Sequence, residues 1–219
     1  MPCNLRHERI IDVSIEEADN AARALRGEIA ACRVCAGFLP LGPRPVVQFS
    51  SSARLLIIGQ APGTRVHQSG VPWDDASGER LRDWLGIGAE MFYDPGRVAL
   101  LPMGFCYPGV AASGGDLPPR PECAPLWHER ARGVLVNIEL TLLVGQYAQH
   151  RYLGKARGGS LTDTVRDAAR YLPAYLPLPH PSWRSTGWMR RNPWFETGIL
   201  PLLRESTARA LDRSGSASV

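Results

Sequence analysis

Short runs of consecutive apolar residues alternate along the chain with longer segments whose apolar residues recur at helical spacing. The clearest run lies in residues 54–59, where Leu-Leu-Ile-Ile is followed by glycine. A continuous run of this kind is typical of a parallel strand that is buried on both faces. Residues 98–103, 140–145 and 171–178 follow the same pattern. The chain is therefore predicted to contain about four parallel strands.

Helical periodicity occupies the segments between and around these strands. Residues 14–31 predict a first helix, which Ser14 and Glu17 open as a capping box. Further helices are predicted over residues 77–85, 122–135 and 146–152. A last helix is predicted over residues 193–210, where Asn192 and Pro193 suit the N-cap and the first turn. Residues 39–47, rich in proline and glycine, predict a loop or a short edge piece.

Strands that alternate with helices indicate an α/β fold, here a three-layer sandwich around a roughly four-stranded parallel sheet. Ligands of such sheets bind at the carboxyl ends of the strands. The residues that directly follow each predicted strand are therefore the first candidates for chemistry.

The composition is that of an ordinary globular protein. Of 219 residues, 44% are hydrophobic and 21% are charged, which excludes disorder as the main state of the chain. We expect one domain over residues 1–213 and a disordered polar tail at 214–219. Apolar runs fall far short of the ~20 residues of a membrane helix, and the amino terminus lacks a signal pattern. We therefore expect a cytoplasmic monomer without membrane association.

The basic residues are almost all arginine. Lysine plus arginine number 25 against 21 for aspartate plus glutamate, and Lys155 is the sole lysine. Arginine forms bidentate hydrogen bonds with phosphate. The bias is compatible with a nucleic-acid partner, although genomic base composition produces the same bias.

The five cysteines are unevenly placed. Cys32 and Cys35 form a C-x-x-C motif, Cys106 and Cys123 form a second pair 17 residues apart, and Cys3 stands alone. In a reducing cytoplasm this arrangement indicates a metal site more than disulfides. From the residues alone, a zinc site, an iron–sulfur cluster and buried thiols all remain open.

Three loops carry the residues best suited to ligand binding. Residues 59–63 (Gly-Gln-Ala-Pro-Gly) follow the first predicted strand, residues 70–78 lead into a helix, and residues 179–184 (Pro-His-Pro-Ser-Trp-Arg) follow the fourth strand. Proline and glycine stiffen such loops and let backbone amides face a ligand. Each motif is weak when taken alone.

Together with the cysteines, these motifs resemble the uracil-DNA glycosylase superfamily, most closely its iron–sulfur bacterial branches, families 4 and 5. The resemblance extends over about residues 30–205 and implies the α/β fold of that superfamily. It also implies a protein that binds uracil-containing DNA and extrudes the damaged base.

The resemblance assigns a role to each motif residue. Gln60 and Ala61 would offer main-chain groups to the uracil, and Trp73 would stack on it. His180 would hydrogen-bond uracil O2 and stabilise the departing anion. The loop that enters the minor groove would contain Ser182, Trp183 and Arg184. Four cysteines would hold a [4Fe–4S] cluster, with zinc as the alternative: Cys32, Cys35, Cys106 and Cys123.

The chain also departs from the superfamily at three positions of the base pocket. Ala61 stands where the best-known members hold a water-activating Asp, and Gly63 stands where they hold a methyl-blocking Tyr. Pro102 replaces the Asn that reads the pyrimidine edge in family 4. Base recognition is therefore expected to rest on main-chain amides, among them those of Gly104 and Phe105.

The resemblance to family 5, whose members carry an Asp shortly after the stacking aromatic, implies that Asp75 holds the attacking water, with Asp74 and His67 as alternatives. An Asp–Asp pair ahead of a helix also suits an N-cap, a purely structural role that Asp74 fits better than Asp75. Either acid is compatible with its structural role alone.

The expected function is a DNA repair glycosylase that hydrolyses the N-glycosidic bond of uracil, or of another deaminated base, and leaves an abasic site. The alternative is a catalytically lapsed DNA-binding or redox-sensing iron–sulfur module on the same fold. A nucleotide hydrolase has less support, since the chain has no G-x-x-x-x-G-K-[ST] phosphate loop.

Overall fold

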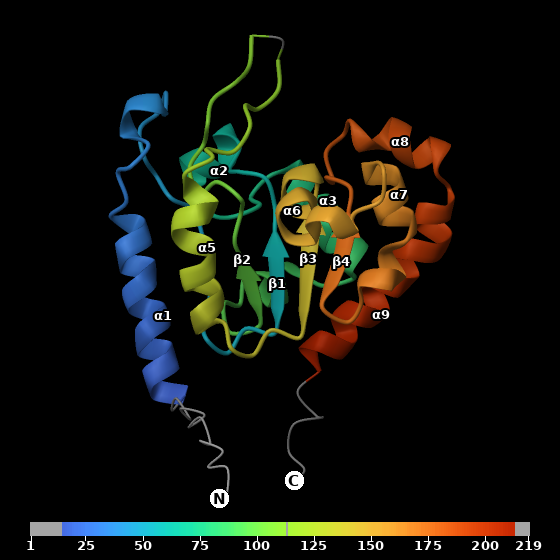
Figure 1. The fold of residues 1–219 in the computed structure, drawn as a ribbon, viewed down its shortest axis with the longest axis horizontal. Helices are drawn as coiled ribbons and strands as arrows, with labels where there is room; N and C mark the ends of the chain where they lie inside the picture. The colour runs from blue at the N-terminus through green and yellow to red at the C-terminus, as the bar shows by residue number, and fades with distance from the viewer. Residues whose placement is uncertain (1–14, 113, 213–219) are drawn as a thin grey trace, which may run out of the picture.

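A computed structural model describes residues 15–112 and 114–212. Its centre is one sheet of four strands, β1 (Leu55–Ile58), β2 (Val98–Leu100), β3 (Leu140–Val144) and β4 (Tyr175–Leu178) (Figure 1). The strands are all parallel, in the order β2-β1-β3-β4. The predicted parallel sheet is confirmed.

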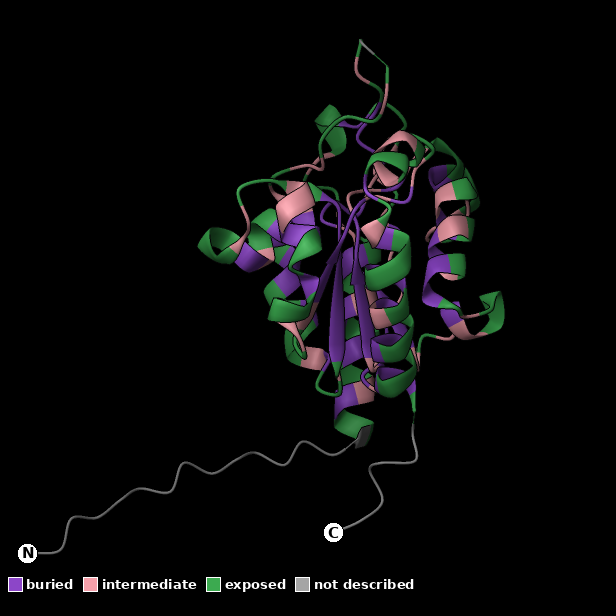
Figure 2. Ribbon diagram, turned by 90° about the vertical axis from the view of Figure 1, so that its right-hand side faces the viewer, coloured by how far each residue is buried: buried purple, intermediate pink, exposed green. Residues whose placement is uncertain are grey.

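Side chains of each strand alternate between two apolar layers. In β1, Leu55 and Ile57 face the cluster that includes Leu81 and Leu203, whereas Ile58 faces the opposite cluster. Because both faces are covered, all four residues of β1 are buried. Figure 2 shows the buried strands between the helical layers, so the three-layer arrangement is confirmed.

The helices divide between the two faces of the sheet. One face is covered by α1 (Ile15–Ala30), α5 (Cys123–Val134) and α6 (Gln146–Leu153). The other is covered by α3 (Ala76–Leu85), α7 (Leu161–Arg166) and α9 (Leu200–Leu211). Shorter helices are α2 (Thr64–Ser69), α4 (Ala89–Phe92) and α8 (Ser185–Arg191), with 3-10 turns at Ala36–Phe38, Gly154–Ala156 and Ala168–Tyr171.

Some boundaries differ from those that the sequence predicts. Strand β2 ends at Leu100, although the N–H groups of Leu101 and Met103 still donate to the carbonyls of Ile57 and Gly59, each at 2.9 Å. Strand β4 begins at Tyr175, since a 3-10 turn takes up Ala168–Tyr171. The last helix begins with a π-helical turn, Phe195–Ile199. Residues 39–47 form a loop without helix or strand, one of the two predicted alternatives, and Gln48 after it forms one isolated antiparallel bridge with Leu100 of β2.

Several predictions lie outside the described residues. These are the capping role of Ser14, the separate Cys3 and the disordered tail at 214–219. Within the described ranges, no helix is long and apolar enough to cross a membrane.

Candidate active site

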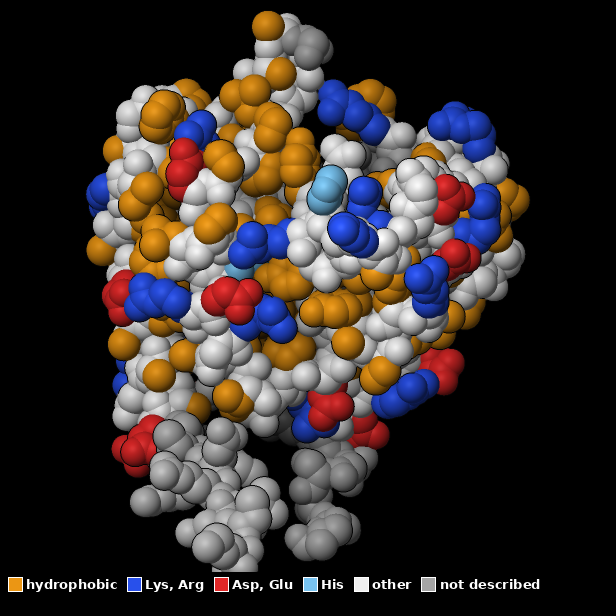
Figure 3. All heavy atoms as spheres, in the orientation of Figure 1, with side chains coloured by type: hydrophobic (Ala, Val, Ile, Leu, Met, Phe, Trp, Pro, Cys, Tyr) orange, Lys and Arg blue, Asp and Glu red, His pale blue; other side chains and the backbone are white. Residues whose placement is uncertain are grey.

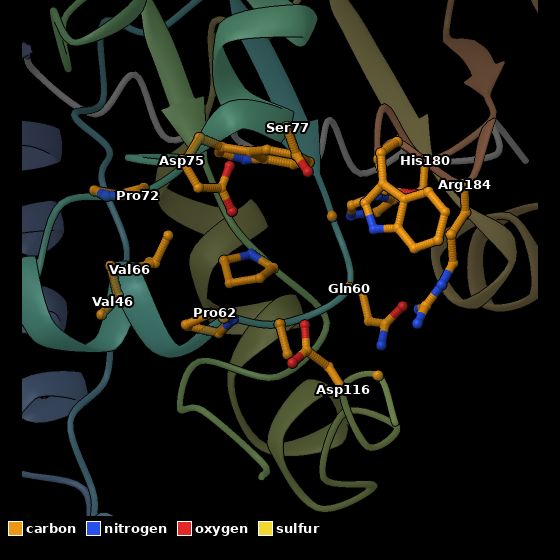
Figure 4. A pocket seen from close by; sticks show the side chains of 18 residues that line it. Val46, Gln60, Pro62, Val66, Pro72, Asp75, Ser77, Asp116, His180 and Arg184 are labelled. Atoms are coloured by element: carbon orange, nitrogen blue, oxygen red, sulfur yellow. The ribbon is translucent and has the colours of Figure 1, made fainter. Parts of the chain in front are cut away.

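A pocket of about 310 Å³ opens at the carboxyl end of the sheet, a volume within the usual range of ligand sites. Its walls come from the loops after β1, β2 and β4 and from the start of α3 (Figure 4). It brings together nearly all the predicted base- and DNA-contacting residues: Gln60, Ala61, Gly63, Trp73, Asp75, His180, Ser182, Trp183 and Arg184.

Trp73 adopts an unusual backbone conformation in the wall of this pocket. Its φ of 57° lies in the left-handed region that few non-glycine residues enter. The Trp73 carbonyl oxygen accepts a hydrogen bond from the Tyr93 hydroxyl at 3.3 Å. The same oxygen packs against Gly78, where an added Cβ would lie 1.8 Å from this oxygen. These neighbours hold the indole stacked on His180, with ring centroids 5.7 Å apart.

His180 follows β4 directly and faces the pocket (Figure 4). Burial lowers its pKa, and the negative charge of Asp75 opposes that shift. With a pKa below its usual value, the imidazole is neutral at neutral pH and has one N–H to donate. The Ser185 hydroxyl donates to the His180 carbonyl and fixes the backbone at this point.

Asp75, and not Asp74, is the N-cap of α3. Asp75 Oδ1 accepts a hydrogen bond of 2.8 Å from the backbone N–H of Gly78. The expectation that Asp74 fits the cap better was therefore wrong. Asp74 lies outside the pocket lining, 3.8 Å from Arg65. The cap bond fixes the Asp75 carboxylate at the pocket wall. Since this bond uses only Oδ1, Oδ2 of Asp75 can still accept a hydrogen bond from a water.

His67, the other alternative, lies on α2 and is not part of the pocket lining. Its side chain is buried, and burial and the charge of Arg44 lower its pKa. The structure gives it no access to a bound base.

The loop after β4 presents an exposed aromatic residue next to the pocket. Trp183 is 74% exposed, and the guanidinium of Arg184 lies 5.3 Å from its ring centroid. Arg80 of α3 donates to the Ser182 carbonyl at 2.7 Å and so holds this loop. No sequence pattern indicates this role for Arg80, because its partner lies 102 residues away along the chain.

Phe105 lies away from the pocket. Its backbone N–H donates to Cys123 Sγ at 3.3 Å, and its ring stacks on His128. The Gly104 N–H likewise donates to the Gln60 carbonyl. Neither amide is available to a base, so the expected recognition by these two amides does not fit the structure.

His128 is fully buried and anchors the start of the β2–α5 loop. Burial lowers its pKa to about 4, so the ring is neutral at neutral pH. Its Nε2 lies 3.0 Å from the Pro102 carbonyl, which can only accept, so Nε2 carries the proton. Its Nδ1 then accepts from the Tyr152 hydroxyl at 2.7 Å. The pocket residue Pro102 is thereby fixed.

Asp116 of the β2–α5 loop also lines the pocket, although no sequence pattern indicates it. Its carboxyl reaches in from the side opposite Asp75 (Figure 4). Gln60 Nε2 donates to the carbonyl of the next residue, Leu117, at 3.3 Å and ties the loop to the β1 end.

The four predicted metal ligands surround a second, small and apolar pocket. Leu39, Phe105 and Trp127 are among its walls, and its cysteines are Cys32, Cys35, Cys106 and Cys123. Burial raises the pKa of the Cys106 thiol to about 11 and that of Cys123 to about 12. In the described part of the chain, no three His, Cys, Asp or Glu side chains are grouped so as to hold a metal ion.

The sequence of this chain also matches a family model. Residues 46–204 match the model of the uracil DNA glycosylase superfamily. The match contains every residue that lines the pocket at the carboxyl end of the sheet and two of the four cysteines, Cys106 and Cys123.

Proposed function

Because the chain belongs to the uracil DNA glycosylase superfamily, we propose that it excises uracil from DNA by hydrolysis of the N-glycosidic bond. Membership in the superfamily supports a general function as a DNA repair hydrolase of the glycosylase type. The observation that carries the finer proposal is the meeting of Trp73, His180 and Asp75 in one pocket at the strand ends. These residues supply an aromatic wall, a neutral N–H donor and a carboxylate.

The extruded base would enter the pocket against the Trp73–His180 stack. Extrusion costs a few kcal/mol of lost stacking, and aromatic contact recovers part of that cost. As the bond between C1′ and the base nitrogen breaks, its electron pair moves onto the uracil ring. The His180 N–H stabilises the resulting anion, as donors aimed at a developing oxyanion do.

The sugar is left as an oxocarbenium-like cation that water captures readily. Asp75 is placed to hold this water and to stabilise the cationic sugar. The new C1′–O bond forms as the water loses a proton, which passes to the carboxylate or to solvent. The products are free uracil and an abasic site.

The loop after β4 is suited to contact the DNA around the extruded nucleotide. Trp183 is the exposed aromatic that fills the vacated stack. Basic side chains lie over the adjoining α8, which ends in Arg190 and Arg191 (Figure 3), and arginines of this kind bind phosphates.

We propose a [4Fe–4S] cluster as the resident cofactor of the cysteine pocket, although the described side chains there are not grouped so as to hold a single metal ion. Its four thiols are close enough to influence one another electrostatically, and the walls are apolar, which suits a thiolate-bound cluster. Cys32, Cys35, Cys106 and Cys123 would hold the cluster, which would cross-link the end of α1 to the β2–α5 loop. It takes no part in the hydrolysis described above.

The proposal is tested by incubating the protein with otherwise identical oligonucleotides that carry uracil, thymine, hypoxanthine or xanthine. Alkali then reveals abasic sites on a gel. Cleavage at uracil is the expected result, in single- or double-stranded DNA. Absence of cleavage at every base would contradict the proposal and favour a DNA-binding module that has lost catalysis.

Asp75 has two roles that substitution can separate. Asp75→Asn keeps the cap, because Asn caps as well as Asp, and is expected to slow excision at least about 10-fold with an unchanged melting temperature. Asp75→Ala should also lose about 1 kcal/mol of stability. Asp74→Ala is the matched control and should change neither quantity. Single-turnover kinetics and thermal melts measure both, and a wild-type rate in Asp75→Asn would remove Asp75 from the reaction.

Protein purified without oxygen is expected to be brown and to contain about four irons per chain. Cys106→Ala should bleach it and lower its melting temperature, because a ligand of the cross-link is lost. Cys3→Ala, outside the described residues, is the control and should stay brown. Metal analysis that finds zinc in a colourless wild type would overturn the cluster.

A further inference from the structure

We propose that Asp116 determines which bases the pocket accepts, its protonated carboxyl reading the edge where a ring N–H lies beside a carbonyl. This inference deepens the proposed function and depends on it. Uracil, hypoxanthine and xanthine all present this lactam edge, because deamination replaces an amino group by a carbonyl.

Other groups near this part of the pocket already have hydrogen-bond partners within the protein. The Pro102 carbonyl accepts from His128, and the Gly104 N–H donates to the Gln60 carbonyl. The Phe105 N–H donates to Cys123. The partners that remain for a bound base are the main-chain groups of Gln60 and Ala61 and the side chains that line the pocket.

The position of Asp116 suits contact with a bound base. Gly63 has no side chain between the β1 loop and this carboxyl, and a Cβ added there would lie 3.7 Å from Asp116 Oδ2. The carboxyl points into the pocket across from Asp75 (Figure 4). Among the described residues it accepts no hydrogen bond and forms no ion pair. A polar group in this position gains most from a partner on the ligand.

The surroundings of Asp116 favour the protonated form of its carboxyl. Partial burial and the negative charge of Asp75 raise its pKa, and Arg184 opposes the shift. Residues 59–63, on the facing β1 loop, have no charged side chain, and His180 is neutral at neutral pH. A base and a DNA backbone that cover the pocket mouth remove more water and raise the pKa further.

The protonated form matches a lactam edge at two points. One carboxyl oxygen accepts from the ring N–H, and the hydroxyl oxygen donates to the neighbouring carbonyl. An ionised carboxylate can only accept, so it would repel that carbonyl. Asparagine offers the same donor and acceptor at every pH, which makes it a rescuing substitution.

The experiment compares wild type, Asp116→Asn and Asp116→Ala in single-turnover excision of uracil from pH 5 to pH 9. The wild-type rate should fall as pH rises through the pKa of Asp116, because only the protonated form donates. Asp116→Asn should lose this fall and equal or exceed wild type at pH 8. Asp116→Ala should be about 10–100-fold slower than wild type at pH 6, as expected for a lost bidentate base contact.

Asp83→Asn, on the exposed side of α3, is the matched control and should keep the wild-type profile. If Asp116→Asn is as slow as Asp116→Ala, the negative charge is what matters and the inference is overturned. It is also overturned if both variants match wild type at every pH. If wild type itself releases no base, the failure lies in the proposed function instead.

Discussion

His180→Ala is expected to slow uracil excision by about 10²–10³-fold while the affinity for DNA changes little. The reason is that a neutral imidazole N–H is aimed at the place where the base becomes anionic, and removal of one such donor has this cost in other enzymes. Ground-state contacts with DNA come mainly from phosphate groups, whereas His180 lies in the wall of the pocket. The loss should therefore appear in the single-turnover rate constant.

The measurement pairs single-turnover kinetics with binding to an oligonucleotide that carries a non-cleavable uracil analogue. His150→Ala on α6, an exposed histidine outside the pocket, is the control and should retain the wild-type rate. An unchanged rate in His180→Ala would remove this residue from catalysis. A parallel loss of binding would assign it to ground-state recognition instead.

Gly78→Ala is expected to damage both folding and activity. The added Cβ would lie 1.8 Å from the Trp73 carbonyl oxygen, a backbone atom that cannot yield without moving Trp73. Overpacking of this kind costs about 1–3 kcal/mol. Because the Trp73 indole supports the His180 ring, a shift of about 1 Å should slow excision by about 10²-fold.

Gly133→Ala is the matched control for this substitution. Gly133 lies in α5, and an added Cβ there meets nothing within 4 Å. Alanine in a helix should be neutral or stabilising by up to about 1 kcal/mol. Thermal melts and excision rates distinguish the two variants. A Gly78→Ala protein with wild-type stability and rate would show that Trp73 need not keep its conformation.

The fold could largely be predicted from local patterns. A strand that is buried on both faces requires consecutive apolar residues, and a helix that is buried on one face requires apolar residues at helical spacing. Both patterns are visible in the sequence. The short helices α2, α7 and α8 were missed, since six or seven residues complete too few turns to show periodicity. The start of β4 was misplaced for a related reason, because apolar residues also fill the preceding 3-10 turn.

The residues of the candidate site that directly follow a buried strand could be predicted from the sequence. His180 and the loop at residues 59–63 come directly after buried strands, and the order of parallel strands places them at one edge. The choice between Asp74 and Asp75 was not predictable, because both residues are aspartate and either can cap a helix. The backbone of Trp73, fixed by the distant Tyr93 and by Gly78, sets where the helix begins.

The sequence by itself determined the α/β class, the parallel sheet, the superfamily and most members of the pocket. These depend on patterns within a few residues and on motifs that follow strands. Tertiary structure decided that Asp75 is the cap, that Asp116 enters the pocket and that Phe105 faces the cysteines instead. Each of these outcomes depends on a contact between segments distant in sequence or on the local backbone conformation. Neither kind of cause produces a periodic pattern of residues that could be recognised in the sequence.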